Sequence, residues 1–472
     1  MEKPMTRKDA LKLGAAAGVA FGATGLLPRA AKAAPVGVGS KPNILLIVVD
    51  DMPDRLLPVM NTVQTRLVAQ GTRFLNAYTG TPLCGPNRAV ILTGLFPHNT
   101  GVLTNSAWKT FRDRGHENFT PFTALNAAGY DTALVGKYMN GRSRTSMRNV
   151  PPGFDRGFDN WYELSGAHDV GTSWWVSDNG TIRDFPASVN ESQHSAEKAR
   201  DWILSRQPAT RPFVIQWSPT NPHQPFDPTA VHAHLYDDEP PRNAPSVNEA
   251  DMSDKPAKMQ KGLVGRAKME EAEEGMREEL EDTDDQVNML LNAAEQVTGN
   301  SNLLVIFTSD NGYQVGEHRV FHKSWQYQES IEIPFLVRGT GLPAQTSDLL
   351  VSSTDIFQTI LRYAGVADPR AVDGRALNDI LAGTAPTTWR KRVLIENPVV
   401  KKWQAYREYQ PSLGKDFVFI RHLDDSDEFY NLATDEFQLE SKPGLITADM
   451  HSKLDRLTRL NADNLRAVEQ EA

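Results

Sequence analysis

The stretch 83–94 holds the residues best suited to chemistry. It contains Cys84, the single cysteine in 472 residues. Pro86 is typical of the first turn of a helix, where its missing N–H costs nothing, and Gly94 is suited to ending that helix. We therefore predict that Cys84 lies at a helix N-terminus, where free N–H groups favour negative charge. Arg88, one helical turn later, adds a cation, so the stretch favours an anionic nucleophile, an anionic substrate or both.

Two apolar runs, 43–49 and 303–307, each lead to oxygen-bearing side chains. Those side chains are Asp50, Asp51, Asp310 and Asn311. Short, continuous apolar runs are typical of buried parallel strands, and ligands bind at the carboxyl ends of such strands. Four oxygen donors without histidine or cysteine select calcium or magnesium over zinc. A solvated turn is the alternative for either strand end taken alone.

Other polar residues follow further predicted strands. Lys137 ends one strand, and His223 follows another in a loop bounded by prolines on both sides. His318 and Lys323 come after the second acidic strand end. Taken singly, a lysine or histidine at such a position is more often solvated than functional.

The apolar pattern predicts an α/β domain and then a smaller α+β region. Strands are expected over 43–49, 72–78, 132–137, 212–217, 303–307 and 333–339, with helices over 59–71, 192–205, 268–298 and 352–364. The early half of 268–298 is rich in acids and is predicted to be a solvated face. Its late half is predicted to pack against the rest of the protein. From about residue 390 short strands are expected at 393–395 and 417–420, and a terminal helix from about 446.

Two segments have the composition of long loops. Residues 140–190 are rich in aromatic side chains, which fit either a substrate wall or simple packing. Residues 236–268 lack periodicity, so we expect a loop excursion that is partly mobile.

Composition and the N-terminus limit the partners and the location. The formal net charge of −9 argues against a nucleic-acid partner. Residues 1–33 predict an export signal, with a basic start, an apolar run and a small-x-small cleavage site. The apolar run is too short for a membrane span. Its basic part is similar to a twin-arginine signal, so we expect a periplasmic or secreted protein, in which a single cysteine forbids an internal disulfide.

Seven short motifs occur in order between residues 42 and 440. They are Asn-Ile-x-x-Ile-x-x-Asp-Asp, Cys-x-Pro-x-Arg, Gly-Lys-Tyr, Pro-His-x-Pro, Ser-Asp-Asn-Gly, Gly-Glu-His and Glu-Phe-Tyr-Asn-Leu-x-x-Asp. This series resembles the type I sulfatases of the alkaline-phosphatase-like superfamily. The Gly-Lys-Tyr-Met-Asn variant at 136–140 is most similar to the branch that contains N-acetylglucosamine-6-sulfatases and many bacterial arylsulfatases.

The resemblance implies both a fold and an activity. The fold is a large mixed, mostly parallel sheet sandwiched by helices in a catalytic domain over 34–390, with a smaller C-terminal subdomain over 391–472. The activity is that of a sulfuric ester hydrolase acting on a small-molecule or glycan sulfate ester. Asn87 departs from the family pattern, which usually has Ser or Ala there.

Carried over position by position, the resemblance also implies roles for single residues. One calcium ion (Ca2+) per chain, with Mg2+ less fitting, would be bound by Asp50, Asp51, Asp310, Asn311 and the side chain at 84. Cys84 would be oxidised to formylglycine by a formylglycine-generating enzyme, which is therefore an expected partner. Arg88 would hold this nucleophile. The residues that bind sulfate and serve the leaving group would be Lys137, His223 and Lys323.

The chemistry that this predicts has two halves. A hydroxyl of hydrated formylglycine attacks sulfur while Asp310 accepts its proton, and the alcohol leaves after protonation by His223 or Lys323. The second hydroxyl then expels sulfate by elimination, an exit that an ordinary serine or cysteine lacks.

One position departs from this scheme. Sulfatases of the arylsulfatase A type have a histidine two residues after the equivalent of Lys137, where this chain has Met139. Another group or water must then assist the expulsion of sulfate, and His318 is our candidate.

Two other functions fit the same residues. A phosphonate monoester or phosphodiester hydrolase would share the metal and the nucleophile. A catalytically silent, exported glycan-binding protein would keep Cys84 unmodified, since a lone cysteine is usually an inert core residue.

Overall fold

A computed structural model describes residues 37–148, 157–164, 172–208, 210–240 and 242–471. The predicted export signal at 1–33 lies outside these residues. Within the described ranges, no helix has both the length and the hydrophobicity that crossing a membrane requires.

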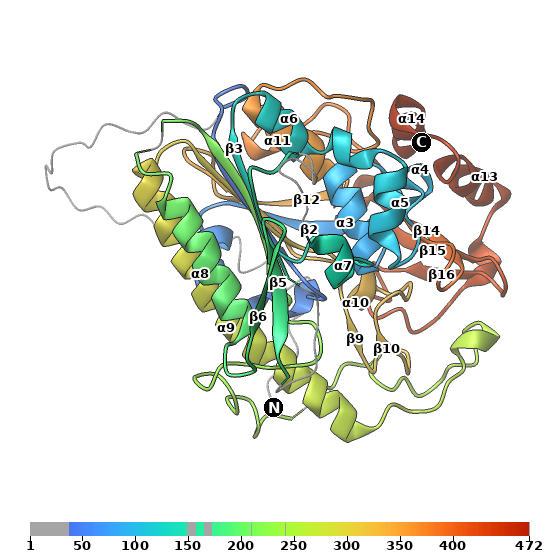
Figure 1. The fold of residues 1–472 in the computed structure, drawn as a ribbon. Helices are drawn as coiled ribbons and strands as arrows, with labels where there is room; N and C mark the ends of the chain where they lie inside the picture. The colour runs from blue at the N-terminus through green and yellow to red at the C-terminus, as the bar shows by residue number, and fades with distance from the viewer. Residues whose placement is uncertain (1–36, 149–156, 165–171, 209, 241, 472) are drawn as a thin grey trace, which may run out of the picture.

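A ten-stranded sheet forms the centre of the molecule (Figure 1). In spatial order it comprises β12 (Gln345–Ser352), β2 (Thr72–Tyr78), β11 (Phe335–Gly339), β8 (Leu303–Ser309), β1 (Asn43–Val49), β7 (Phe213–Ser218), β3 (Asp131–Gly136), β4 (Asn160–Leu164), β5 (Trp174–Asp178) and β6 (Thr181–Phe185). The five strands from β8 to β4 run parallel, as do β12 and β2, whereas β11, β5 and β6 are antiparallel to their neighbours. The predicted mixed, mostly parallel sheet is confirmed.

Helices cover both faces of this sheet (Figure 1). On one face α3 (Cys84–Thr93), α5 (Ala107–Asp113), α6 (Pro121–Ala127) and α11 (Asp355–Ala364) pack on alternate residues of β1. On the other face α8 (Glu191–Leu204) and the long α9 (Arg266–Thr298) pack on the remaining residues of β1. Because both faces are buried, the central strands are continuously apolar, which is why their sequence signal is strong.

A second, antiparallel sheet follows in the C-terminal part. It comprises β13 (Arg392–Asn397), β14 (Trp403–Gln410), β15 (Lys415–His422) and β16 (Glu428–Asn431). The expected terminal helix is two helices, α13 (Ala448–Leu457) and α14 (Ala462–Gln470). Shorter α-helices and strands of the described residues are α2 (Asn61–Val63), α4 (Pro97–Thr100), α7 (Arg144–Met147), β9 (Gln314–Val315), β10 (Phe321–His322), α10 (Gln328–Ile331) and α12 (Asn378–Leu381).

Three expectations about local structure differ from the fold. Residues 54–68 form a chain of short helical turns rather than one helix over 59–71. The loop expected over 140–190 contains β4, β5 and β6, whose aromatic side chains Trp161 and Trp174 are buried in the core. The early half of α9 is also not a solvated face, because Glu279 and Asp282 are buried and accept hydrogen bonds from the backbone N–H groups of a facing loop.

Candidate active site

The two acidic strand ends lie side by side. β1 and β8 are parallel neighbours in register, with Val49 opposite Ser309, so the acids that follow them emerge at the same sheet edge. The amide nitrogen of Asp51 donates to Asp310 Oδ1 at 3.2 Å, and Asn311 Nδ2 donates to Asp51 Oδ1 at 2.6 Å. All of these side chains are buried. The expected convergence of the strand ends is present in the structure.

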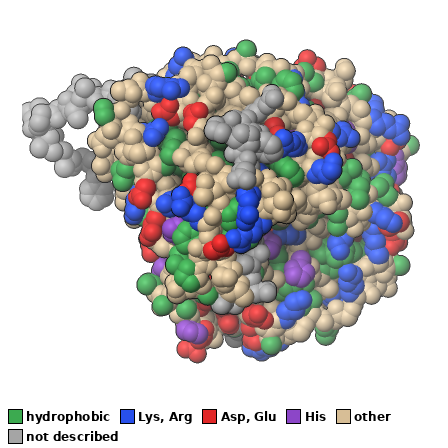
Figure 2. Space-filling view, viewed as in Figure 1, with side chains coloured by type: hydrophobic (Ala, Val, Ile, Leu, Met, Phe, Trp, Pro, Cys, Tyr) green, Lys and Arg blue, Asp and Glu red, His purple; other side chains and the backbone are tan. Residues whose placement is uncertain are grey.

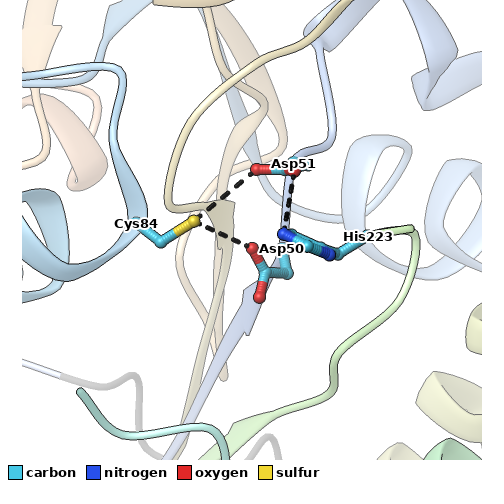
Figure 3. A group of neighbouring side chains, drawn as sticks. All are labelled: Asp50, Asp51, Cys84 and His223. Carbon is cyan, nitrogen blue, oxygen red and sulfur yellow. Dashed lines mark hydrogen bonds and ion pairs between the residues drawn. The ribbon is translucent and has the colours of Figure 1, made fainter. Parts of the chain in front are cut away.

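Cys84 opens α3 directly in front of these acids (Figure 3). Its Sγ lies 3.4 Å from Asp50 Oδ1 and 3.8 Å from Asp51 Oδ1, and the residue is 1% exposed. Gly94 ends the helix in the left-handed conformation, which confirms the predicted helix. Burial, together with the charge of Asp50, raises the pKa of the Cys84 thiol, so the side chain is a neutral thiol in this arrangement.

Arg88, one turn into α3, connects three parts of the site. Its Nε donates to Asp310 Oδ2 at 2.9 Å, its Nη2 lies 3.6 Å from Asp50 Oδ2, and its Nη1 donates to the carbonyl oxygen of Lys137 at 2.8 Å. Burial and the charge of Asp50 raise the pKa of the Asp310 carboxyl to about 6, although Arg88 opposes this shift. A carboxylate of that pKa is suited to accepting a proton near neutral pH.

Two lysines and a histidine face the same acids. Lys137 Nζ contacts Asp50 Oδ2, and Lys323 Nζ lies 2.6 Å from Asp51 Oδ2. His223 Nε2 lies 3.6 Å from Asp51 Oδ2 (Figure 3). Burial alone would raise the pKa of Asp50, but the charge of Lys137 holds it below its ordinary value. Burial lowers the pKa of His223, which favours the neutral ring.

The donor set suits a divalent cation. Ligand atoms of Asp50, Asp51, Cys84 and His223 all lie within 4.8 Å of one another. Asn311 Oδ1 is buried and has no hydrogen-bond partner among the described residues. A buried carbonyl oxygen without a partner costs about 1–3 kcal/mol, a penalty that a bound cation removes. Carboxylate and amide oxygens are hard ligands, so the residues present fit Ca2+ or Mg2+.

His318 lies apart from this cluster. Its ring is fully buried, Nδ1 is 2.7 Å from Glu249 Oε2, and the ring stacks on Tyr327 with centroids 3.8 Å apart. Met139, at the position where the arylsulfatase A type has histidine, is a core residue. The geometry therefore gives no support to His318 as the group that assists sulfate expulsion.

Asn87 has a role that the sequence did not reveal. Its Nδ2 donates to the carbonyl oxygen of Asp310 at 2.5 Å, and its Oδ1 accepts from Gly80 N at 3.1 Å and from Ser353 Oγ at 2.8 Å. The residue that departs from the family pattern thus fastens α3 to the end of β8. No spacing rule pointed to this contact.

A second missed group borders Lys323. The hydroxyl of Tyr313 donates to Gln224 Oε1 at 3.0 Å and lies 2.7 Å from Nδ1 of His322, whose side chain is exposed. The chain of three links the loop of His223 to the segment that carries Lys323. In the sequence, only its position directly before Lys323 pointed to a role for His322.

Comparison with known proteins identifies the family. A model of the family named Sulfatase matches residues 42–366, and a model of the C-terminal part of N-sulphoglucosamine sulphohydrolases matches residues 316–459. The chain belongs to the sulfatase family. The sequence-based recognition is confirmed, and so is the fold class.

Relatives in this family include glycan sulfatases. The chain is 28% identical over 411 residues to the extracellular sulfatase Sulf-1 homolog of Caenorhabditis elegans. The matched region covers 79% of this chain but only 54% of that protein. It therefore spans about half the length of that relative. It is 26% identical over 486 residues to the N-acetylglucosamine-6-O-sulfatase of Bacteroides thetaiotaomicron, covering 85% of this chain and 82% of the relative.

Solved structures share the architecture. A protein solved in complex with its substrate, D-glucosamine-2-N,6-O-disulfate, has a TM-score of 0.72 at 22% identity, covering 88% of this chain and 96% of that one. The phosphonate monoester hydrolase of Agrobacterium radiobacter has a TM-score of 0.67 at 18% identity, covering 87% and 93%. At these identities the similarity establishes the fold.

Proposed function

We propose that this protein is a sulfuric ester hydrolase that cleaves sulfate monoesters of carbohydrates, and aryl sulfates as model substrates. The convergence of acids from two strand ends on Cys84 carries the proposal. Arg88, Lys137 and Lys323 surround the same point, and an anionic ester needs such a concentration of positive charge.

Asp50, Asp51, Asp310, Asn311 and the side chain at 84 would hold one Ca2+ per chain. Bound Ca2+ supplies Lewis acidity, which lowers the pKa of a hydroxyl and polarises a sulfate oxygen. The oxygen-rich donor set, and Asn311 Oδ1, which no described residue pairs, support this assignment over a soft metal.

Formylglycine at position 84 would supply the nucleophile, made from Cys84 by a formylglycine-generating enzyme. The thiol is 1% exposed in the folded chain, so we infer that oxidation precedes folding. This order fits export of a folded protein through the predicted signal at 1–33, and we propose a periplasmic or secreted location.

The chain's own residues would then divide the work. Arg88 fixes the orientation of Asp310, which accepts the proton of the attacking hydroxyl. Lys137 and Lys323 offset the charge of the sulfate oxygens. Burial alone would lower the pKa of Lys323, but the charge of Asp51 helps to raise it above its ordinary value, so that Lys323 stays protonated. We assign protonation of the departing alcohol to His223 or Lys323, because both lie against Asp51, which is itself 3.8 Å from Cys84 Sγ.

Turnover of matched substrates tests the proposal. The protein is co-expressed with a formylglycine-generating enzyme, and kcat/KM is measured for an aryl sulfate and for an aryl phosphonate monoester. A larger kcat/KM for the sulfate supports the proposal. A larger value for the phosphonate would favour the second candidate, a phosphonate monoester hydrolase, which has the same fold.

Peptide mass spectrometry separates both enzymes from a silent glycan-binding protein. A peptide spanning position 84 with the mass of formylglycine supports the enzyme. A thiol that alkylates fully after denaturation, together with no turnover, would support the binding protein.

A further inference from the structure

Two lysines lie against one indole ring next to the candidate active site. Lys261 Nζ is 4.1 Å and Lys401 Nζ is 4.0 Å from the ring centroid of Trp325. Lys261 comes from the loop before α9, and Lys401 comes from the turn between β13 and β14. The two ammonium groups can therefore be no farther apart than the sum of these two distances. We call them the Trp325 lysine pair.

The charges of this pair lack acidic partners. Within the described ranges, no carboxylate lies at ion-pair distance from Lys261 or Lys401, whereas their neighbours Lys258 and Lys402 share Asp424 at 2.6 and 3.4 Å. Asp425, next to Asp424 in the sequence, accepts the backbone N–H of Lys258 at 2.9 Å. Like charges held close together, with an indole ring but no carboxylate against them, form a site that favours an anion.

The pKa values of the pair point in the same direction. Partial burial, and then the charge of Lys401, lowers the pKa of Lys261. Partial burial, and then the charge of Lys258, lowers the pKa of Lys401. A bound anion would offset the repulsion between the ammonium groups.

The pair is connected to the active site through the chain itself and through a hydrogen bond. Trp325 follows Lys323 by two residues, and Lys323 contacts Asp51. Trp403 Nε1 donates to the carbonyl oxygen of Ser324 at 2.9 Å, which fixes the start of β14 against the same segment.

The strand before the turn is attached as well. The amide of Glu396 in β13 donates to Gly80 O at 3.1 Å, in the loop that leads to Cys84. Lys401 N donates to Asn397 Oδ1 at 3.1 Å and so orders the turn itself. Figure 2 shows that Lys and Arg side chains are prominent over the right half of the viewed face, where Figure 1 places β9, β10 and β14–β16.

We propose that the Trp325 lysine pair binds a second sulfate group of the substrate, so that the enzyme prefers multiply sulfated oligosaccharides. The inference rests on the proposed function, because the scissile sulfate is placed at residue 84. Two ammonium donors match the several acceptor oxygens of a sulfate, and the net charge of −9 means that such binding must be local.

Removing both charges tests the proposal. In the double variant Lys261→Gln/Lys401→Gln, KM for a multiply sulfated oligosaccharide is expected to rise about tenfold, with a weaker dependence on salt. The kcat/KM for a singly sulfated monosaccharide carrying the same scissile ester should stay unchanged. Equal losses on both substrates, or no loss on either, would overturn the proposal.

Lys198→Gln is the matched control. Lys198 is an exposed lysine on α8, across the sheet from α3. Its Nζ lies 5.6 Å from the centroid of the Tyr162 ring. It should leave both substrates unaffected, and a loss as large as that of the double variant would contradict a local site.

A binding measurement keeps this inference separate from the proposed activity. In the Cys84→Ser background, titration calorimetry with the same oligosaccharide should show affinity that falls about tenfold in the double variant. If that fall occurs while the protein with Cys84, co-expressed with a formylglycine-generating enzyme, hydrolyses no sulfate ester, the pair is supported and the proposed function fails. Equal affinity for single-stranded DNA of similar charge would identify a non-specific polyanion surface and overturn the proposal.

Discussion

The candidate active site and a second buried charge cluster differ in how their acids are paired. In the second cluster, the guanidinium of Arg390 binds Asp355 through two parallel contacts of 2.8 and 2.6 Å. Asp355 also accepts the backbone N–H groups of Ser352 and Arg375. Its carboxylate is fully engaged by the protein.

Two acids of the active site have simpler partners than Asp355. Lys137 and Lys323 act as point charges on Asp50 and Asp51, and Asn311 Oδ1 has no partner among the described residues. A planar, two-point pair fixes geometry, whereas a flexible ammonium can move when a cation or an anion arrives. The comparison teaches that burial of charge alone does not mark a site; the way the charges are paired does.

The largest effect should come from the active site. Asp310→Asn is expected to lower kcat for an aryl sulfate by about 10³-fold or more, because it removes the proton acceptor and the negative charge of a proposed metal ligand. Because Asp310 is also the buried partner of Arg88, some stability should be lost as well, so kcat is measured per folded molecule. Calcium titration of the same variant should show weaker binding, and wild-type kcat with wild-type calcium affinity would contradict the placement of the metal.

Asp355→Asn should show the opposite profile. Removing one partner of a buried ion pair costs about 3–5 kcal/mol of stability, and the loss should lie toward the lower end because Arg390 keeps Glu469 at 3.4 Å. Denaturant unfolding measures this loss, while kcat per folded molecule should match the wild type. A variant with unchanged stability and lost activity would contradict the assignment of the Asp355–Arg390 cluster to stability alone.

His223→Ala sharpens the assignment within the active site. If His223 protonates the leaving group, kcat for a sugar sulfate should fall about 10²-fold, with a smaller loss for an activated aryl sulfate. Rates are compared over a series of leaving groups. An equal loss across the series would remove the acid role and leave a binding role.

The smallest effect concerns a histidine outside both clusters. His98 Nδ1 lies 2.7 Å from Glu396 Oε1 and joins α4 to β13. Burial lowers the pKa of His98, but the hydrogen bond and charge of Glu396 outweigh it and raise the pKa above 6.5. The contact therefore stabilises the fold fully below the ordinary pKa, and this contribution is lost as pH rises through the raised value.

Comparison with His98→Gln measures that contribution. The stability advantage of the wild type should shrink by about 1 kcal/mol or less between about pH 6 and about pH 9. A pH-independent difference, or one that grows with rising pH, would contradict the sign.

Sequence reasoning succeeded where the signal is local. Apolar strands buried on both faces read as continuous runs, and the polar residues after β1 and β8 stood out against them. The helix of Cys84 was predictable from Pro86 and Gly94. Family motifs then supplied Lys137, His223 and Lys323, all of which the fold brings to one place.

The rest depended on contacts between distant segments. The strands β4–β6 were missed because their aromatic residues pack into cores that other elements build. The acids in the early half of α9 were predicted to be solvated. Glu279 is instead buried and accepts a hydrogen bond from the backbone N–H of Asp227 in a facing loop. The Trp325 lysine pair brings together residues from three separate segments, so it could not be predicted from the spacing of residues in the sequence.

The central claim is that acids from two strand ends hold a divalent cation beside residue 84, and that the assembled site releases sulfate. Calcium content and sulfate release, measured on the co-expressed protein before and after chelation, test it most directly. The account predicts one Ca2+ per chain, loss of sulfate release when it is removed, and recovery when it is returned. Undiminished sulfate release from metal-free protein would contradict the account.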